Sequence, residues 1–137
     1  NSRTVLYVED NPANLMLVED LLARRPDIRL LTAHDGHRGI EIARASLPDV
    51  ILMDINLPGI SGIQALNVLA QDATTARIPV VALSANAVPR DIARGMEAGF
   101  FRYLTKPLKV NEFMETLDIA LTLAESRAAR AAEAGNS

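Results

Sequence analysis

Short apolar runs alternate with amphipathic segments along this chain. Several of the runs are continuous rather than alternating with polar residues, which is typical of strands buried on both faces. Segments with apolar residues at helical spacing lie between the runs and after the last one. This alternation predicts an α/β fold, a doubly wound parallel sheet of five strands with five helices on its two faces. The five runs are Thr4–Val8, Ile28–Thr32, Val50–Met53, Val80–Leu83 and Phe101–Leu104.

Turn and capping residues fall where this pattern needs them. Asn11 precedes Pro12, so we expect Asn11 to cap the first helix and Pro12 to occupy its first turn. Gly59 and Gly62 bracket a turn after the third run, and Gly99 follows the fourth helical segment. These signals support the predicted order of strands and helices.

The chain length of 137 residues favours one domain. No linker composition interrupts residues 4–124, so we expect a single domain over residues 3–124. The remainder, residues 125–137, is rich in alanine and is expected to prolong the last helix and then fray.

Composition excludes several classes of function. With 49% apolar and 23% charged residues, no apolar run of about 18 residues and no export signal, we expect a soluble fragment with no membrane contact and a cytoplasmic location. A longer parent protein with a membrane anchor stays compatible with this. The absence of cysteine excludes disulfides, thiolate nucleophiles and cysteine-based metal sites. A net charge of −3 argues against direct binding of nucleic acid.

Polar residues close most of the predicted strands. The first run ends in Glu9 and Asp10, the third in Asp54, the fourth in Ser84, and Lys106 follows the fifth. Ligands of a doubly wound parallel sheet bind outside the carboxyl ends of its strands. We therefore expect these five side chains to converge on one rim.

Three carboxylates at one rim would repel one another, so a cation is expected there. Oxygen ligands without His or Cys favour Mg²⁺, and the backbone carbonyl of Asn56 is one more candidate ligand beside Asp54. The hydroxyl of Ser84 and the ammonium of Lys106 suit the oxygens of a phosphoryl group. Together these parts predict phosphoryl transfer to the carboxylate of Asp54.

Each residue also has a plainer interpretation. Taken singly, Asp54 and Ser84 are cap or turn residues, and Lys106 is a solvated surface charge. His34 and His37 lie three residues apart, but no third metal ligand accompanies them, so they are interpreted as solvated loop residues. Tyr103 is interpreted either as a core aromatic or as an outward-pointing one.

At these residues the chain closely resembles the receiver domains of two-component response regulators, over about residues 3–124. The matching segments are VLYVEDNPAN, PDVILMDINLPGISG, PVVALSANA and AGFFRYLTKPL. The resemblance implies a flavodoxin-like fold with strand order 2-1-3-4-5. Glu9 replaces a commoner Asp of the family and Ser84 a commoner Thr. The segments SANAVPRDI and AGFFRYLTKPLKVNEFMETLD are most similar to receivers of hybrid sensor histidine kinases.

The resemblance also implies a role for each site residue. Asp54 is the phospho-acceptor, Asp10, Asp54 and the Asn56 carbonyl bind Mg²⁺, and Glu9 acts on the metal through water. Ser84 and Lys106 bind the phosphoryl oxygens, and the bond from Lys106 to Pro107 is the family's cis peptide. Ser84 and Tyr103 rearrange together on phosphorylation.

The implied partners are a histidine kinase or a histidine phosphotransfer protein. The phosphate comes from a phosphohistidine, and the domain catalyses its own phosphorylation and dephosphorylation without being a free-standing turnover enzyme. The affected surface is the fourth helix, fifth strand and fifth helix, about residues 87–121, where a homodimer could also form. The parent chain is expected to be a hybrid histidine kinase or a single-domain regulator.

Two rival interpretations stay open at this point. A phosphatase of the haloacid dehalogenase type also combines an Asp nucleophile with Ser, Lys and Mg²⁺, but it normally has an acidic residue where this chain has Asn56. A degenerate receiver that only binds partners would lack part of the acidic, Ser and Lys set.

Overall fold

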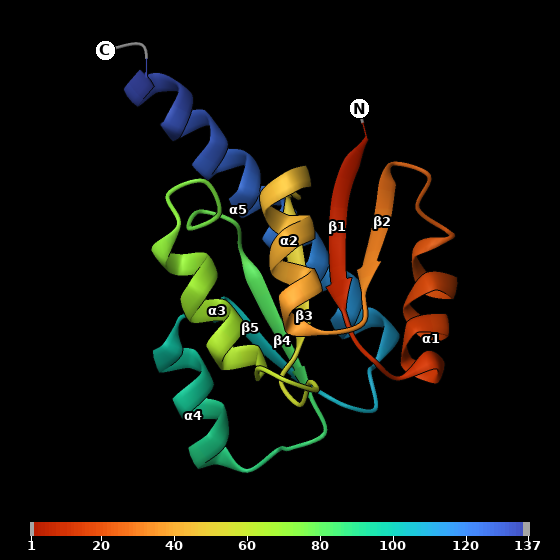
Figure 1. Ribbon diagram of the computed structural model, residues 1–137. Coiled ribbons are helices and arrows are strands. Elements are labelled where there is room, and N and C mark those ends of the chain that lie inside the picture. The colour runs from red at the N-terminus through yellow and green to blue at the C-terminus, as the bar shows by residue number, and fades with distance from the viewer. Residues whose placement is uncertain (1, 136–137) are drawn as a thin grey trace.

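The computed structural model describes residues 2–135. Five strands and five helices alternate, as the apolar pattern predicts. The strands are β1 Arg3–Val8, β2 Ile28–Ala33, β3 Val50–Asp54, β4 Val80–Ser84 and β5 Arg102–Thr105. The helices are α1 Pro12–Leu22, α2 Gly36–Ser46, α3 Gly62–Gln71, α4 Pro89–Ala98 and α5 Val110–Gly135 (Figure 1).

All strand pairs are parallel, in the order β2-β1-β3-β4-β5. The predicted doubly wound sheet and its strand order are confirmed. The fifth strand begins at Arg102, one residue later than predicted. Phe101 lies just before it, and its N–H donates a hydrogen bond to the Val80 carbonyl oxygen at 2.8 Å.

Helices cover both faces of the sheet (Figure 1). Buried side chains of α1 and α5 pack with Val5, Tyr7, Leu52 and Leu83 on one face. Buried side chains of α2 and α3 pack with Leu6, Val8, Ile51 and Met53 on the other. Each large apolar side chain removed from water in this way contributes about 1.5–3 kcal/mol before the entropy of ordering is counted.

Local capping agrees with the sequence. The Asn11 side-chain oxygen accepts hydrogen bonds from the N–H groups of Ala13 and Asn14, at 2.9 and 3.2 Å, which confirms Asn11 as the cap of α1. Ser61 and Gln64 form a reciprocal capping box at the start of α3. Gly99 is the C-cap of α4, as predicted.

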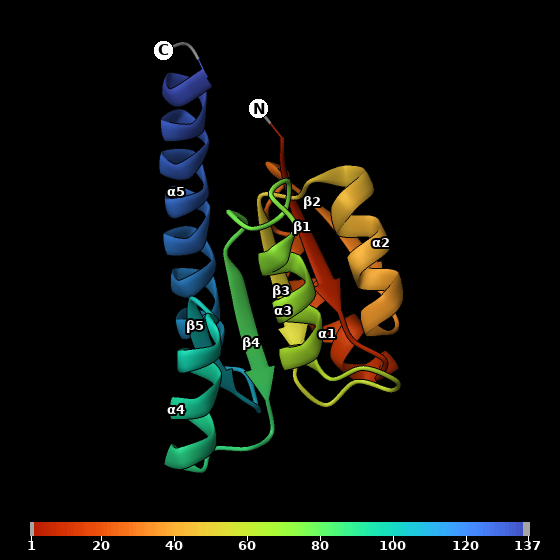
Figure 2. The same ribbon diagram turned by 60° about the vertical axis from the view of Figure 1, so that its left-hand side comes forward.

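Helix α5 is 26 residues long and continues past the sheet on the side away from the strand carboxyl ends (Figure 2). Its later turns are held to the body by an ion pair between Arg3 and Glu125 at 2.6 Å and by a hydrogen bond from Arg127 to the Arg77 carbonyl oxygen at 3.0 Å. Of the predicted extension over residues 125–137, residues 125–135 lie in this helix, and residues 136–137 lie outside the described residues. Within residues 2–135, no helix combines the length and apolar character of a membrane span.

Candidate functional site

The carboxyl ends of β1, β3, β4 and β5 meet at one edge of the sheet, at the bottom of Figure 1. Glu9 and Asp10 follow β1, Asp54 ends β3, Ser84 ends β4, and Lys106 comes one residue after β5. The structure therefore brings the predicted strand-end residues to the same edge.

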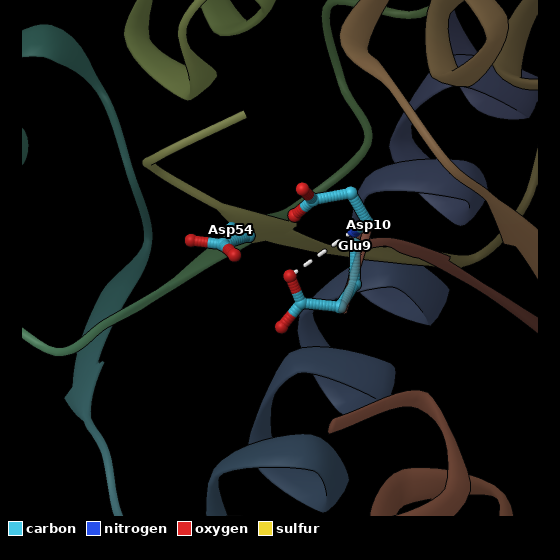
Figure 3. Close-up of side chains that lie close together, drawn as sticks. All are labelled: Glu9, Asp10 and Asp54. Carbon is cyan, nitrogen blue, oxygen red and sulfur yellow. Dashed lines mark hydrogen bonds between the residues drawn. The ribbon is translucent and has the colours of Figure 1, made fainter. Parts of the chain in front are cut away.

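Glu9, Asp10 and Asp54 form an acidic cluster beyond the ends of β1 and β3 (Figure 3). One carboxylate oxygen from each lies within 4.8 Å of the others. Glu9 is fully buried and Asp54 is 5% exposed, whereas Asp10 is exposed. Because water reaches the two buried carboxylates poorly, their repulsion is weakly screened.

Lys106 bridges the two buried carboxylates. Its Nζ lies 2.9 Å from Glu9 Oε1 and 3.2 Å from Asp54 Oδ2. The peptide bond between Lys106 and Pro107 is cis. One ammonium, in contact with two of the three carboxylates, leaves the cluster with net negative charge.

The pKa values reflect this crowding. Burial first, and then the neighbouring Glu9 carboxylate, raise the pKa of Asp54 to about 7. Burial alone would also raise the pKa of Glu9, but hydrogen bonds with Asp54 and Lys106 outweigh it and lower that pKa. Burial opposes the charge of Lys106, while its contacts with Glu9 and Asp54 raise its pKa overall. The ammonium therefore keeps its proton, and a proton at the cluster is held preferentially by Asp54.

The backbone around Asp54 is fixed from two sides. The side-chain Oδ1 of Asp54 accepts a hydrogen bond from the Asn56 N–H at 3.0 Å. Gly62, at the start of α3, packs so closely that a Cβ there would lie 2.6 Å from the Asp54 carbonyl oxygen. Glycine is therefore required where α3 meets the end of β3.

Ser84 and Tyr103 contact the same loop residue, Asn86. The Ser84 Oγ accepts a hydrogen bond from the Asn86 N–H at 3.0 Å, and the Tyr103 hydroxyl donates to the Asn86 carbonyl oxygen at 3.0 Å. The Asn86 side chain in turn donates to Asp91 at 2.6 Å, which ties the loop to the first turn of α4. A continuous set of contacts thus runs from the end of β4 to Tyr103 on β5.

Comparison with known proteins identifies the architecture. The family model described as the response regulator receiver domain matches residues 5–118. The chain belongs to the response regulator receiver family. It is accordingly a receiver domain of two-component signalling, and the phosphatase interpretation is set aside.

Individual relatives of this receiver agree in length and in fold. The polar-differentiation response regulator DivK of Brucella ovis is 35% identical over 116 residues, which span 85% of this chain and 94% of DivK. The receiver domain of sensor histidine kinase PA1611 from Pseudomonas aeruginosa PAO1, with a magnesium ion coordinated in its active-site cleft, is 33% identical with a TM-score of 0.81. That match covers 89% of this chain and 99% of the other. The receiver of a LuxO repressor protein from Vibrio parahaemolyticus shares the fold at a TM-score of 0.86 and 21% identity, covering 93% and 96% of the two chains.

These relatives include both a regulator and a kinase receiver. The predicted greater similarity to receivers of hybrid kinases is therefore not confirmed. Membership of the receiver family is independent of that distinction.

Sequence reasoning missed two residues of this receiver site, Tyr7 and Asn86. Tyr7 is buried on β1, and its hydroxyl donates to Glu9 Oε1 at 3.1 Å. A signal was present, since residues two apart on a strand share a face and Glu9 follows Tyr7 by two. His34 and His37 are exposed as expected, but His37 lies in the first turn of α2 rather than in a loop.

Proposed function

We propose that Asp54 accepts a phosphoryl group from the phosphohistidine of a histidine kinase or of a histidine phosphotransfer protein, in a Mg²⁺-dependent reaction. The observation that carries this proposal is the pairing of a buried strand-end carboxylate with the Lys106 ammonium, 3.2 Å away, inside an acidic cluster. An ammonium in this position can neutralise the charge of a phosphoryl group on Asp54. Membership of the receiver family supports the same chemistry.

The donor set fits a magnesium ion. Three carboxylates gather without any His or Cys among them, and oxygen ligands select hard cations. In this proposal Asp10, Asp54 and the backbone carbonyl of Asn56 bind the ion and Glu9 acts through water. Bound Mg²⁺ supplies the positive charge that allows an anionic phosphodonor to approach a carboxylate. The magnesium in the cleft of the PA1611 receiver supports this assignment.

The chain's own residues then have distinct tasks. A carboxylate oxygen of Asp54 forms the new O–P bond while the P–N bond of the phosphohistidine breaks, and the electron pair of that bond stays on the leaving imidazole. The Lys106 ammonium binds one phosphoryl oxygen. Ser84 uses its oxygen as an acceptor for the Asn86 N–H, so its own O–H is available to donate to another phosphoryl oxygen. Hydrolysis of the acyl phosphate, catalysed by the same site, returns Asp54 to its carboxylate form.

The proposed output is a change in the surface formed by α4, β5 and α5. A phosphoryl group draws Ser84 toward it, which disturbs the hydrogen bond from Asn86 to Ser84 and, through Asn86, the contact with Tyr103. A partner or a second copy that prefers the rearranged surface shifts the equilibrium by its differential affinity. A homodimer through this surface is part of the proposal.

The experiment is intact-mass analysis after incubation with acetyl phosphate and Mg²⁺. We expect the parent to gain one phosphoryl group and Asp54→Asn to gain none. Asp20→Asn, which removes an exposed carboxylate on α1, serves as the control and should label like the parent. Labelling of Asp54→Asn at the parental rate, or mapping of the phosphate to another residue, contradicts the proposal. A parent that never labels, although folded, is the degenerate receiver.

The setting of the domain is also proposed. Residues 3–124 act as the receiver, within a hybrid sensor histidine kinase or as a single-domain regulator, and residues 125–135 extend the last helix. A cytoplasmic location accords with a phosphohistidine donor. Phosphotransfer assays with kinases of the same organism, each supplied in trans, identify the donor.

A further inference from the structure

Tyr7 belongs to the apolar core, but its hydroxyl group reaches the acidic cluster of the site. Its side chain is fully buried and belongs to the cluster beneath α1 and α5, together with Val5, Leu15 and Phe113. Its hydroxyl donates a hydrogen bond to Glu9 Oε1 at 3.1 Å. Burial first, and then the negative charge of Glu9, raise the pKa of Tyr7, so the hydroxyl remains a donor. A buried hydroxyl is retained in a core where it has a partner, and here that partner is Glu9.

The Glu9 carboxylate accepts hydrogen bonds from Tyr7, Lys106 and the Asp10 backbone, and the Asn14 side chain also contributes. Its Oε1 accepts from Tyr7 and from the Lys106 ammonium, at 3.1 and 2.9 Å, and its Oε2 accepts from the Asp10 N–H at 3.2 Å. The same Lys106 Nζ reaches Asp54 Oδ2 at 3.2 Å. The Tyr7 hydroxyl is therefore two hydrogen bonds away from the ammonium that faces the acceptor carboxylate.

We propose that Tyr7 is a positioning residue for phosphoryl transfer: its hydroxyl fixes the Glu9 carboxylate, and Glu9 in turn holds the Lys106 ammonium against Asp54. This inference rests on the proposed function of Asp54. Glutamate has one more rotatable bond than aspartate, so its carboxylate can occupy more positions above the strand. The Tyr7 hydroxyl and the Asp10 N–H, which both donate to this carboxylate, limit those positions. Lys106, on a flexible four-carbon stem, gains a fixed anchor as a result.

A purely structural role for Tyr7 makes a different prediction. If the ring only fills the core and the hydroxyl only completes its own hydrogen bond, loss of the hydroxyl changes the stability of the fold and leaves Lys106 unaffected. If Tyr7 positions Glu9, loss of the hydroxyl changes the hold on Lys106 even when the fold is intact.

The test uses Tyr7→Phe, which keeps the buried ring and removes the donor. The first readout is the affinity for beryllofluoride, a phosphoryl mimic, at saturating Mg²⁺, followed by NMR. We expect it to weaken about three- to tenfold, the range that one net hydrogen bond carries. The second readout, made without metal, is the ¹H–¹⁵N signal of the Lys106 ammonium, whose hydrogens exchange slowly with water while the group is held. We expect this signal to broaden in Tyr7→Phe.

Two further variants separate positioning from packing. Val5→Ala creates a cavity one pleat further from the site on the same face of β1, so it lowers stability and should leave both readouts at parental values. Glu9→Asp withdraws the carboxylate by about 1.5 Å, one C–C bond, away from the Tyr7 hydroxyl. In that background Tyr7→Phe should have no further effect on beryllofluoride affinity, because the two residues act as one unit.

The outcomes are distinguishable. An affinity of Tyr7→Phe within twofold of the parent overturns the inference, as does an effect of full size in the Glu9→Asp background. A parent that binds no beryllofluoride at all contradicts the proposed function of Asp54 itself, before Tyr7 is considered.

Discussion

Asp54→Asn should stabilise the metal-free protein, because the acidic cluster holds more repulsion than attraction. Two unit charges 4.8 Å apart, the outer limit for the nearest oxygens of this cluster, repel by about 3.5 kcal/mol at an effective dielectric constant of about 20. Asp54 has two such neighbours, Glu9 and Asp10. The single attraction, from Lys106 at 3.2 Å, amounts to about 5 kcal/mol on the same scale. Repulsion therefore exceeds attraction by about 2 kcal/mol.

Screening of the exposed Asp10 reduces this difference, and the amide oxygen of an asparagine still accepts from the Asn56 N–H and from Lys106. We expect a gain of about 1–2 kcal/mol in the free energy of unfolding, seen as a rise of about 3–8 °C in Tm. The assay is thermal unfolding in the presence of a chelator at about pH 8, above the raised pKa of Asp54, where its carboxylate carries the full charge used here. Asp20→Asn, an exposed aspartate of α1, is the matched change of charge and should stay within about 0.5 kcal/mol of the parent.

Two added conditions sharpen the measurement. Mg²⁺ at about 100 times its Kd should stabilise the parent by about 2.7 kcal/mol and Asp54→Asn by much less. The difference in unfolding free energy between the two proteins should therefore shrink or change sign. The second condition is pH. Because the pKa of Asp54 is raised from 3.8 to about 7 in the folded protein, the folded state binds the proton more tightly between these values. The metal-free parent therefore gains stability as pH falls from 7 to 5, and Asp54→Asn lacks this gain.

Glu9, with its lowered pKa, acts in the opposite direction, but only below its ordinary value of 4.5. It therefore lies outside the pH window of the measurement. A metal-free Asp54→Asn protein that melts at or below the parental temperature would refute the reasoning from repulsion.

Two more predictions concern the metal and the output surface. Asp10→Asn should weaken Mg²⁺ binding about tenfold and slow phosphorylation, as measured by NMR titration and by labelling with acetyl phosphate; an unchanged Mg²⁺ affinity removes Asp10 from the site. Beryllofluoride should shift amide signals throughout residues 87–121, including Tyr103. Changes confined to the loops after β1, β3 and β4 would contradict the coupling through Asn86.

The fold could be predicted because the central strands carry unambiguous signals. Every residue of β3 and β4 is buried, so their sequences are continuous apolar runs up to the polar residue that ends each strand. The edge strand β5 is only partly buried, with a pattern that mixes exposed and buried positions, and its predicted start at Phe101 was one residue early. Apolar patterning weakens where burial weakens, and boundaries at a sheet edge become less certain.

The site could be predicted in outline because parallel topology sends every strand end to one edge. The finer contacts depend on side-chain rotamers and loop geometry. Tyr7 within VLYV reads as one more core residue, and its bond to Glu9 exists because of the position the Glu9 side chain adopts. Asn86 resembles any loop asparagine until the path from Ser84 to α4 is traced in three dimensions. Spacing places Tyr7 and Glu9 on one face of the strand, but the hydrogen bonds themselves depend on side-chain and loop geometry.

The length of α5 gives the domain an extension that its sheet lacks. At 1.5 Å per residue its 26 residues span about 39 Å, roughly twice the reach of a six-residue strand. The helix begins four residues after Lys106 and is tethered farther along by Glu125 and Arg127. Because its first turns are buried against the sheet and its later turns are tethered, α5 moves as one body with the domain, and the eight residues after Arg127 extend it by about 12 Å.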